Sequence, residues 1–355
     1  MPHPVTMKAV ATAAGVHQTT VSLALRDHAS IPPATRERIK NLARALGYQV
    51  NPLVSALISS RHRAGPEVVR RSAIGYISAD PPAQGGAEAI HAYPDLIAGA
   101  RARAKELGYG LDHLWVGDPS LTRARFSQIT TARGIHGIIV APLADRRPDL
   151  AIIDWDRFAA VAYGYSLAEP ALHRVTPDFY HAMLALLHRL RAAGWRRLGL
   201  VMDDNNDLKS NHLWLAAYLA EQRLGPADSR LEPLLLPHWD PRAMQAWFDN
   251  TRPEIIISLR KMHNHIGPWL CAHPAPIARE VQLVGLQRCI QDAVPWPGIA
   301  LERETVGAIC VDFVVAMLHR NERGIPAHAQ KVLVSTGWLD VPPLRPAPSR
   351  CAATH

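Results

Sequence analysis

The N-terminal segment carries apolar side chains at helical spacing, interrupted once by a glycine. In its first part these side chains repeat every three or four residues and are Met7, Val10, Ala11 and Ala14. Gly15 then gives the backbone the freedom that a sharp turn requires. The apolar set of the next part is Val16, Val21, Ala24 and Leu25. The pattern therefore predicts two short helices joined by a tight turn.

A third helix and a short apolar segment are predicted next. Pro32-Pro33 sets the first turn of the helix, Gly47 ends it, and its buried stripe consists of Ile39, Leu42, Ala43 and Leu46. Asn51-Pro52 is a strong start signal for a further helix. Its apolar residues, unusual for a connection between domains, are Leu53, Val54, Leu57 and Ile58. We expect a helix-turn-helix head at 1–50, a hinge helix at 51–60 and a linker at 61–71.

From Ser72 onward, short apolar runs alternate with helical stretches. The runs expected to be strands are Ile74–Ser78, Leu111–Val116, Gly137–Ala141, Ala159–Tyr163, Leu198–Met202, Ile255–Leu259 and Val281–Leu286. The helical stretches between them include Asp95–Leu107, Asp178–Ala193 and Asp207–Leu224, followed by the possible left-handed caps Gly108, Gly194 and Gly225. Strands that alternate with helices predict parallel sheets covered on both faces.

Two lobes of this kind fit the length of the body. We expect the N-terminal lobe at 72–174 with a return segment at 302–330, and the C-terminal lobe at 175–301 with 331–342. The proline-rich tail at 343–355 is expected to be partly disordered. The predicted fold is an all-α head followed by a bilobed α/β body made of two parallel-sheet sandwiches.

Composition excludes several classes of protein. The chain has 355 residues, of which 48% are hydrophobic, and this suggests two or three globular domains. No apolar run approaches the roughly 20 residues that span a bilayer, and no secretion signal is evident at the start. The four cysteines lack a CxxC pair and are Cys271, Cys289, Cys310 and Cys351. We therefore expect a cytoplasmic protein with reduced thiols.

Charge is concentrated at the N-terminus. Residues 1–63 contain eight Lys or Arg and two acidic residues, a net charge of +6, whereas the whole chain carries +8. A basic head on a nearly neutral body is typical of phosphate contact confined to one module, although a solvated basic surface would give the same count. The start of the second helix adds side chains that its core does not use, namely Gln18, Thr19, Thr20, Ser22 and Leu23. Such side chains on an exposed helix fit a DNA major groove, so the head is expected to bind DNA.

Other motifs give weaker signals. His263 and His265 lack a nearby third ligand and are expected in an exposed loop, and His181 and His188 on the polar side of one helix. Gln84-Gly85-Gly86 is interpreted as a flexible loop, with a ligand-contacting loop as the alternative. Four tryptophans expected in the core or in lobe packing are Trp155, Trp247, Trp269 and Trp296. The chain has no hydrolase, NTPase or dinucleotide motif, so we expect neither an enzyme nor a bound cofactor or metal.

These residues resemble the LacI/GalR (lactose-repressor) family of bacterial transcription regulators. The head motifs that carry the resemblance are Val5-Thr-Met-Lys-Ala-Val-Ala, Ala14-Gly-Val, Thr20-Val-Ser, Thr35-Arg-Glu-Arg-Ile and Leu46-Gly-Tyr. Looser matches in the body are Ile74-Gly-Tyr-Ile, Gly137-Ile-Ile-Val, Val175-Thr-Pro-Asp, Gly194-Trp-Arg-Arg-Leu-Gly-Leu and Leu283-Val-Gly. The resemblance implies a homodimer whose heads bind a palindromic operator. It also implies a periplasmic-binding-protein-like body that closes on a small molecule.

The resemblance assigns roles on the DNA side. Gln18 and Thr19 correspond to the principal base readers, and Leu57 to a wedge inserted into the minor groove. Packing of the hinge helix on the body is the alternative for Leu57. Many members carry Arg where this chain has Leu23, which favours apolar contact with a thymine methyl. The full set expected to contact DNA is Thr6, His17, Gln18, Thr19, Thr20, Ser22, Leu23, Asn51, Leu53, Val54 and Leu57.

The effector pocket departs from sugar-responsive members of the family. Trp214 stands in place of an Arg, Arg260-Lys261 in place of an Asn-Asp pair, and Gln287 where Asp often occurs nearby. Since these losses remove groups that bind hydroxyls, a neutral sugar is not expected. An anionic or aromatic effector is one hypothesis, and a degenerate cleft is the other. The expected effector-binding set is Ser78, Tyr93, Tyr163, Asp178, Asp203, Trp214, Arg260, Lys261 and Gln287.

The sequence therefore predicts a dimeric, sequence-specific transcription regulator, expected to be a repressor. The alternative is an effector-independent or architectural DNA-binding protein.

Overall fold

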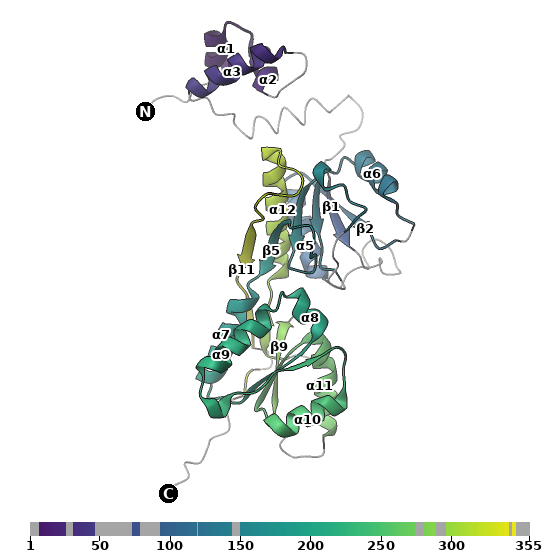
Figure 1. Ribbon diagram of the computed structural model, residues 1–355, viewed down its shortest axis with the longest axis vertical. Helices are drawn as coiled ribbons and strands as arrows, with labels where there is room; N and C mark the ends of the chain where they lie inside the picture. The colour runs from purple at the N-terminus through teal and green to yellow at the C-terminus, as the bar shows by residue number, and fades with distance from the viewer. Residues whose placement is uncertain are drawn as a thin grey trace. The chain divides into compact units, whose positions relative to one another are not determined.

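The computed structural model describes residues 7–25, 31–46, 73–78, 93–118, 120–143, 150–273, 280–288, 296–340 and 343–345. The chain divides into two compact units, residues 1–69 and 70–355. They are called the head and the body below. The hinge helix at 51–60, the linker at 61–71, the Gln84-Gly85-Gly86 loop and most of the tail lie outside the described residues (Figure 1).

The described part of the head contains three helices around a small core. They are α1 (Met7–Ala14), α2 (Gln18–Leu25) and α3 (Pro33–Ala45). The core residues, contributed by all three helices, are Val10, Ala11, Ala14, Val21, Ala24, Ile39 and Ala43. Gly15 has a φ of 66°, which confirms the predicted turn. Leu46 was expected in the buried stripe but is 38% exposed, because α3 ends one residue earlier.

The first lobe of the body is a six-stranded, wholly parallel sheet with the order β11-β5-β4-β3-β1-β2. Its strands are β1 (Ala73–Ser78), β2 (Gly110–Trp115), β3 (Gly137–Val140), β4 (Ala159–Tyr163), β5 (His173–Pro177) and β11 (Lys331–Val334). One face packs against α5 (Pro94–Glu106) and α12 (Arg303–Arg320). The opposite face packs against α6 (Arg123–Ala132) and η1 (Trp155–Arg157). The sheet is thus covered on both sides, as the sequence predicts.

The second lobe repeats this plan. Its sheet has the order β12-β10-β9-β8-β6-β7, and only the β10–β12 pair is antiparallel. Its strands are β6 (Leu198–Asp203), β7 (Leu234–Leu236), β8 (Ile255–Leu259), β9 (Gln282–Arg288), β10 (Gly298–Ala300) and β12 (Gly337–Leu339). Helices α7 (Phe179–Ala192) and α9 (Leu213–Leu224) cover one face, and α10 (Pro241–Thr251) and α11 (Arg260–Ala272) the other. Two short elements, α8 (Asp204–Lys209) and η2 (Ala227–Ser229), complete it.

Three connections in the described part of the chain pass between the lobes. They join β5 to α7, β10 to α12 and β11 to β12. Residues 331–342 were expected in the C-terminal lobe, but β11 pairs with β5 in the first sheet, from Lys331 beside Arg174 to Val334 beside Pro177. The third crossing therefore follows Val334. The short β11, with Lys331 and Leu333 exposed, lacks the long apolar run by which the other strands of this sheet were recognised.

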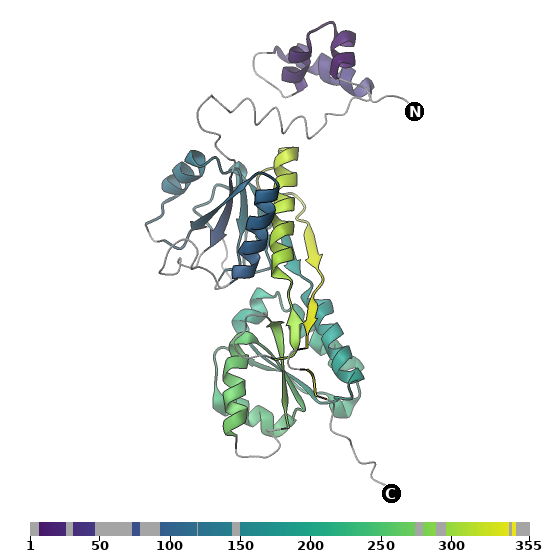
Figure 2. The same ribbon diagram turned by 180° about the vertical axis from the view of Figure 1, so that it is seen from behind.

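Helices α5 and α12 lie side by side in both views (Figures 1 and 2). Their contact is unusually close because each contributes a glycine. A Cβ added at Gly99 would lie 2.0 Å from the carbonyl oxygen of Glu304, and one added at Gly307 would lie 2.1 Å from that of Leu96. The two backbones therefore touch without intervening side chains, which ties the returning α12 to the first lobe.

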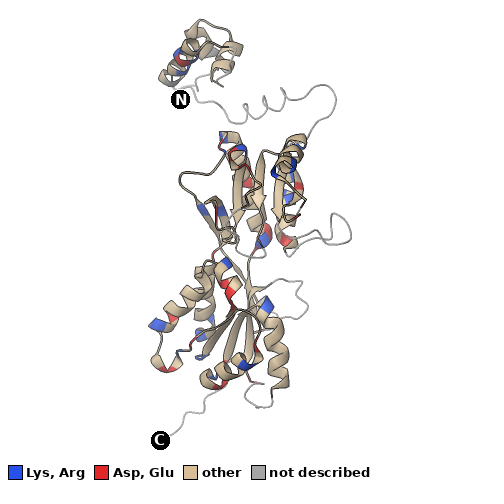
Figure 3. Ribbon diagram, turned by 45° about the vertical axis from the view of Figure 1, so that its right-hand side comes forward, with Lys and Arg blue, Asp and Glu red and all other residues tan. Residues whose placement is uncertain are grey.

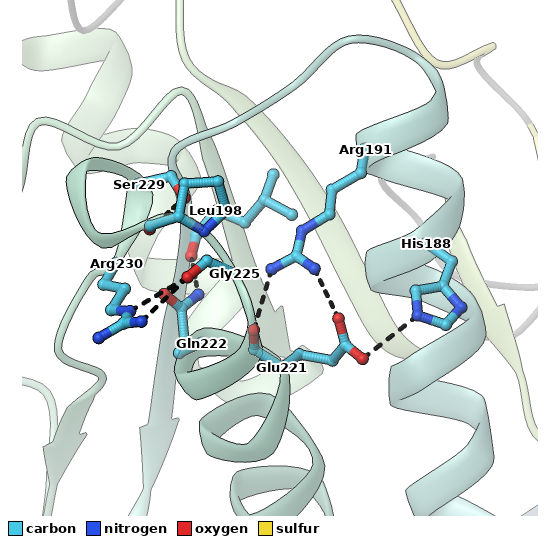
Figure 4. Close-up of polar contacts among 9 residues, drawn as sticks. His188, Arg191, Leu198, Glu221, Gln222, Gly225, Ser229 and Arg230 are labelled. Atoms are coloured by element: carbon cyan, nitrogen blue, oxygen red, sulfur yellow. Dashed lines mark hydrogen bonds and ion pairs between the residues drawn. The ribbon is translucent and has the colours of Figure 1, made fainter.

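Helix α7 is joined to α9 by a polar contact as well as by the core. Glu221 of α9, whose side chain is 10% exposed, accepts a hydrogen bond from Arg191 Nη1 of α7 at 2.6 Å, and its backbone oxygen accepts one from Nη2 at 3.2 Å. His188 Nε2 lies 3.2 Å from the same carboxylate (Figure 4). His181 and His188 are exposed on α7, which confirms their placement on its polar side.

The single helix predicted over Asp207–Leu224 is in fact two. Asn211 and His212 have φ values of 55° and 59°, so the chain turns between α8 and α9. His212 Nδ1 lies 2.6 Å from a carboxylate oxygen of the buried Asp207, which fixes this turn. Gly108 and Gly194 are left-handed as expected, but Gly225 is extended, with a φ of −76°. Among the described helices, none is long and apolar enough to cross a membrane.

Candidate nucleic-acid interface and ligand cleft

The N-terminal end of α2 is organised by His17. The backbone oxygen of His17 accepts hydrogen bonds from the amides of Thr20 and Val21, at 2.9 and 3.2 Å. Its ring Nδ1 lies 2.9 Å from Thr19 Oγ1 and also accepts from the Thr19 amide at 3.4 Å. The ring therefore serves as an N-cap, a function in which Ser, Thr, Asp or Asn is more usual. It also fixes the hydroxyl of Thr19.

Residues at the start of α2 differ in exposure, and this difference separates core residues from residues that could contact DNA bases. Val21 and Ala24 are fully buried, whereas His17, Gln18 and Thr19 are exposed. Among the other expected contacts, Thr20 and Leu23 are half-buried. The side chain of Ser22 lies outside the described part of the chain, as do Thr6, Asn51, Leu53, Val54 and Leu57. The contact of these residues with DNA stays a prediction.

The basic residues of the head do not all serve one purpose. Arg38 of α3 donates to the backbone oxygen of Ala14 at 3.2 Å and so ties α3 to the end of α1. Lys40 lies 4.0 Å from Glu37 on the same helix. In the body, Figure 3 shows both signs of charge in each lobe, in keeping with its small net charge.

A cleft that is partly open to solvent receives side chains from both lobes of the body. The first lobe contributes Tyr93, Pro142, Tyr163, Gly164, Tyr165 and Ser166, and the second contributes Phe179, Asn206, Lys209, Ser210 and Gln287. Most of these residues follow the carboxyl ends of strands or precede the first turns of helices, where ligands of parallel α/β sheets usually bind.

Aromatic rings dominate the cleft. The rings of Tyr93 and Tyr163 are 6.3 Å apart between centroids and inclined by 35°. Burial raises the pKa of the Tyr163 hydroxyl well above its ordinary value, and burial likewise raises that of Tyr165. Both phenols are therefore neutral hydrogen-bonding groups at physiological pH. Phe179 forms part of the other side and packs on Trp214 behind it, with 5.1 Å between ring centroids.

A buried cation, Arg303, lies beside the aromatic residues of the cleft. Its guanidinium lies 5.5 Å from the centroid of the Tyr93 ring, and Nη1 donates to Asp95 Oδ2 at 3.2 Å. Nη2 also lies 3.5 Å from the backbone oxygen of Gln287 in the second lobe. Burial opposes the charge of Arg303, but Tyr163 and Asp95 outweigh it and hold the pKa above its ordinary value. Arg303 thus connects both lobes next to the cleft.

Several residues expected in the cleft are elsewhere. Tyr93, Tyr163 and Gln287 do line it, whereas the expected residues absent from its lining are Ser78, Asp178, Asp203, Trp214 and Lys261. Trp214 is 0% exposed and belongs to the core between α7, α9 and the second sheet, so it cannot be the stacking wall. Lys261 is exposed on α11, and the side chain of Arg260 lies outside the described part of the chain.

The two expected aspartates are occupied as helix caps. Asp203 is 1% exposed and accepts hydrogen bonds from the backbone and side-chain nitrogens of Asn206, at 3.0 and 2.7 Å. Asp178 accepts from the backbone nitrogen of His181 at 3.2 Å. These bonds stabilise the first turns of α8 and α7.

The paired histidines also differ from expectation. His263 and His265 lie on α11 rather than in an exposed loop. His263 is 3% exposed, with Nδ1 2.7 Å from Ser258 Oγ, and His265 stacks on Trp239. Trp155, Trp247, Trp269 and Trp296 do pack against hydrophobic clusters, as predicted. Within the described residues, no group of three His, Cys, Asp or Glu side chains could hold a metal ion.

The sequence interpretation missed Tyr165, Phe179, Asn206, Lys209 and Arg303. A usable signal existed for Tyr165, because Tyr163-Gly-Tyr165 directly follows the strand predicted at Ala159–Tyr163. Lys209 was placed inside one long predicted helix, and Asn206 lies directly before the start of that helix. Arg303 became recognisable only when its helix was seen to return beside the cleft.

Residues 6–51 match the family model described as bacterial regulatory proteins, lacI family. An HTH-type transcriptional regulator of Mycolicibacterium smegmatis is 27% identical over 203 residues, which are 56% of this chain and 52% of that protein. A similar regulator of Mycobacterium tuberculosis is 27% identical over 196 residues, covering 55% and 52% of the two chains. The chain therefore matches over about half the length of these curated relatives.

Solved structures share the fold. The lac repressor dimer bound to operator and the anti-inducer ONPF aligns with a TM-score of 0.53 and 16% identity, covering 95% of this chain and 98% of that one. The complex of the transcriptional regulator CelR with cellobiose aligns with a TM-score of 0.55 and 18% identity, covering 94% and 98%. A regulator from Rhizobium etli gives 0.56 and 18%, covering 75% and 96%.

Proposed function

We propose that the chain is a regulator of the lacI family, whose model matches residues 6–51, and that it regulates transcription by sequence-specific DNA binding. The observation that supports this most strongly is the start of α2. Gln18 and Thr19 are exposed there, while Val21 and Ala24 of the same helix are fully buried. A helix anchored in this way can present its N-terminal side chains to base edges in a major groove.

We further propose that two copies bind a palindromic operator in the cytoplasm and repress transcription. A solved structure of similar fold is a lac repressor dimer bound to operator. A symmetric dimer places two equivalent helices on a palindrome with one fixed half-site spacing. Leu57, with its apolar neighbours in the sequence, would insert at the centre of the operator and bend it.

The cleft of the body is proposed as the control site. A ligand that binds one arrangement of the lobes better than another shifts the population toward that arrangement. If the lobes set the spacing of the two heads, binding in the cleft and binding to the operator are coupled, and the coupling is reciprocal. Arg303 supports this proposal because it contacts Asp95 of the first lobe and Gln287 of the second.

Selection of duplexes from random DNA by the purified full-length chain tests this function. We expect a palindrome with conserved half-sites to be enriched. Gln128, an exposed glutamine on α6 of the body, offers the matched control for a change at Gln18 of the head. The variant Gln128→Ala should select the same sequence as the unaltered chain. If the folded protein enriches no sequence motif, the proposal is contradicted.

A further inference from the structure

We propose that the first lobe holds a second ligand site, in a hollow between α6 (Figure 1) and η1, and that this site binds a small amphipathic anion, an apolar body that carries one carboxylate. The space is called the α6 hollow below. Its described residues come from the first two turns of α6 and from residues 152–158, and none of them also lines the cleft between the lobes. The proposal therefore goes beyond the proposed function and does not depend on it.

The α6 hollow has the size and the floor that such a ligand needs. Its volume is about 420 Å³ and it is partly open to solvent, whereas small-molecule sites typically have volumes of roughly 300–1,000 Å³. Phe126 and Phe158 meet edge to face in its floor, with 6.1 Å between their ring centroids. Ala124 and Ile152 complete the apolar lining. An alkyl or aryl body placed here leaves water, which favours binding.

Arg157 supplies hydrogen-bond donors at the edge of this apolar floor. Its Nη1 donates to Ser127 Oγ, and its Nη2 donates to Thr131 Oγ1 at 2.8 Å, so two hydroxyls of α6 hold the guanidinium in place. The guanidinium also lies 5.8 Å from the centroid of the Phe158 ring. Because an arginine has five N–H donors, these two bonds leave donors for a ligand. A carboxylate accepts such charge-assisted hydrogen bonds more strongly than a neutral oxygen does.

The other charges of the α6 hollow do not cancel that of Arg157. Arg123 Nη2 lies 3.7 Å from Asp154 Oδ1, so these two lining residues compensate each other. Asp156 is directed toward the loop after α12, since its Oδ1 lies 3.0 Å from the position that a Cβ of Gly324 would occupy. Among the described residues, Arg157 is paired with two hydroxyls and with no carboxylate. The described lining thus contains one positive charge more than its carboxylates compensate.

The remaining charged residues on and around α6 lie outside the described lining. Arg133 lies 3.7 Å from Asp112 of β2, and Arg125 is exposed. Asp118, which precedes the helix, accepts hydrogen bonds from the amide and the hydroxyl of Ser120. Asp154 is therefore the one carboxylate among the described residues that line the α6 hollow. A cationic ligand would meet both lining arginines, so the sign of the ligand charge is the property that the site should discriminate.

Calorimetric titration of the full-length protein tests this discrimination. The probes are octanoate and 4-phenylbutyrate, which join an alkyl or an aryl body to a carboxylate. Octan-1-ol, octylamine and acetate are the comparisons. We expect at least one of the two carboxylates to bind at least tenfold more tightly than each comparison compound. Binding of neither carboxylate, or binding of octylamine or octan-1-ol as tight as that of the better carboxylate, would overturn the inference.

A charge variant tests the role of Arg157. Arg157→Met should weaken the carboxylate at least tenfold and leave octan-1-ol nearly unchanged, because the donors are lost and the apolar floor remains. Arg133→Met is the matched control, since Arg133 is exposed on the same helix and does not line the α6 hollow. An equal loss of carboxylate binding in the two variants would overturn the role given to Arg157. Thermal unfolding of each variant establishes that it is folded.

A filling variant keeps the proposal testable if Arg157→Met does not fold. Ala124→Trp puts an indole into the α6 hollow and should weaken the carboxylate and octan-1-ol alike, at least tenfold. Ala132→Trp is its control, because Ala132 is exposed at the end of α6 and does not line the space. Tyr165→Leu, which alters the cleft between the lobes, should leave carboxylate binding unchanged. Unaltered binding in Ala124→Trp, or a loss confined to Tyr165→Leu, would place the ligand elsewhere and overturn the proposal.

Discussion

The head and the cleft achieve exposure of functional groups in different ways. In the head, one short helix carries both its anchors, Val21 and Ala24, and its exposed residues Gln18 and Thr19. In the cleft, the groups come from the ends of several strands and helices in two lobes. A local site can be altered residue by residue. An assembled site depends on the packing that brings its parts together, so body variants remote from the cleft should disturb it.

The largest effect is expected where α12 meets α5. Gly307→Ala would place a Cβ 2.1 Å from the Leu96 oxygen, and backbone atoms cannot move aside as a flexible side chain can. We predict that the body loses about 3 kcal/mol of unfolding free energy. Calorimetry of the full chain measures this. Gly110→Ala is the control, because its Cβ would meet Ala73 Cβ at an ordinary 3.7 Å. Equal stability of the two variants would show that the helices are not packed so closely.

Removing the carboxylate beside Arg303 should have a smaller but clear effect. Asp95→Ala leaves a buried guanidinium without its acceptor, and we expect a loss of about 2 kcal/mol in unfolding free energy. Asp312→Ala removes a more exposed pair with Arg103 and should cost much less. Chemical denaturation of both variants tests the difference. If Asp95→Ala loses no more unfolding free energy than Asp312→Ala, the ion pair between Arg303 and Asp95 does not stabilise the body as a buried pair should.

On the head, Gln18→Ala should act on specificity rather than on folding. Since Gln18 is exposed, its replacement is expected to leave the head folded. Discrimination should fall by about 1–3 kcal/mol at one or two operator positions. Affinities for single-base variants of the selected operator measure this. A uniform loss at every position would assign Gln18 to the phosphate backbone instead.

The smallest effect is expected at the cap of α2. His17→Ala removes the ring that accepts from the Thr19 amide and should lower the stability of the head by about 0.5 kcal/mol. It should also weaken discrimination by Thr19, whose hydroxyl is no longer held. His17→Asn should restore the cap, because Asn is a preferred N-cap residue. Should Asn fail to restore stability, the capping role of His17 would be wrong.

The sequence pattern predicted the helices of the head and many strands of the lobes, because these elements depend on local periodicity. The strands Ala159–Tyr163 and Ile255–Leu259 were predicted at their observed bounds, since each is an apolar run of the length a buried strand requires. The short β11 and β12 were missed because their few residues give no such run. The break at Asn211 and His212 was missed, although Asn and His adopt the left-handed conformation more readily than most other residues.

The cleft was only partly predictable. Tyr93, Tyr163 and Gln287 could be placed from position and resemblance. Trp214 could not, because whether an indole faces a cavity or a core depends on which face of α9 meets the sheet. Arg303 is separated from its partner Asp95 by 208 residues. Such a pairing follows from the returning helix and not from any local pattern.

A specific regulator must distinguish one duplex sequence from others through its head. The decisive measurement is the ratio of affinities for the selected operator and for a scrambled duplex, obtained by fluorescence anisotropy at one fixed salt concentration. A specific regulator should show a ratio of about 10³ or more. A ratio near one for the folded full-length chain would contradict the claim and indicate an architectural DNA-binding protein.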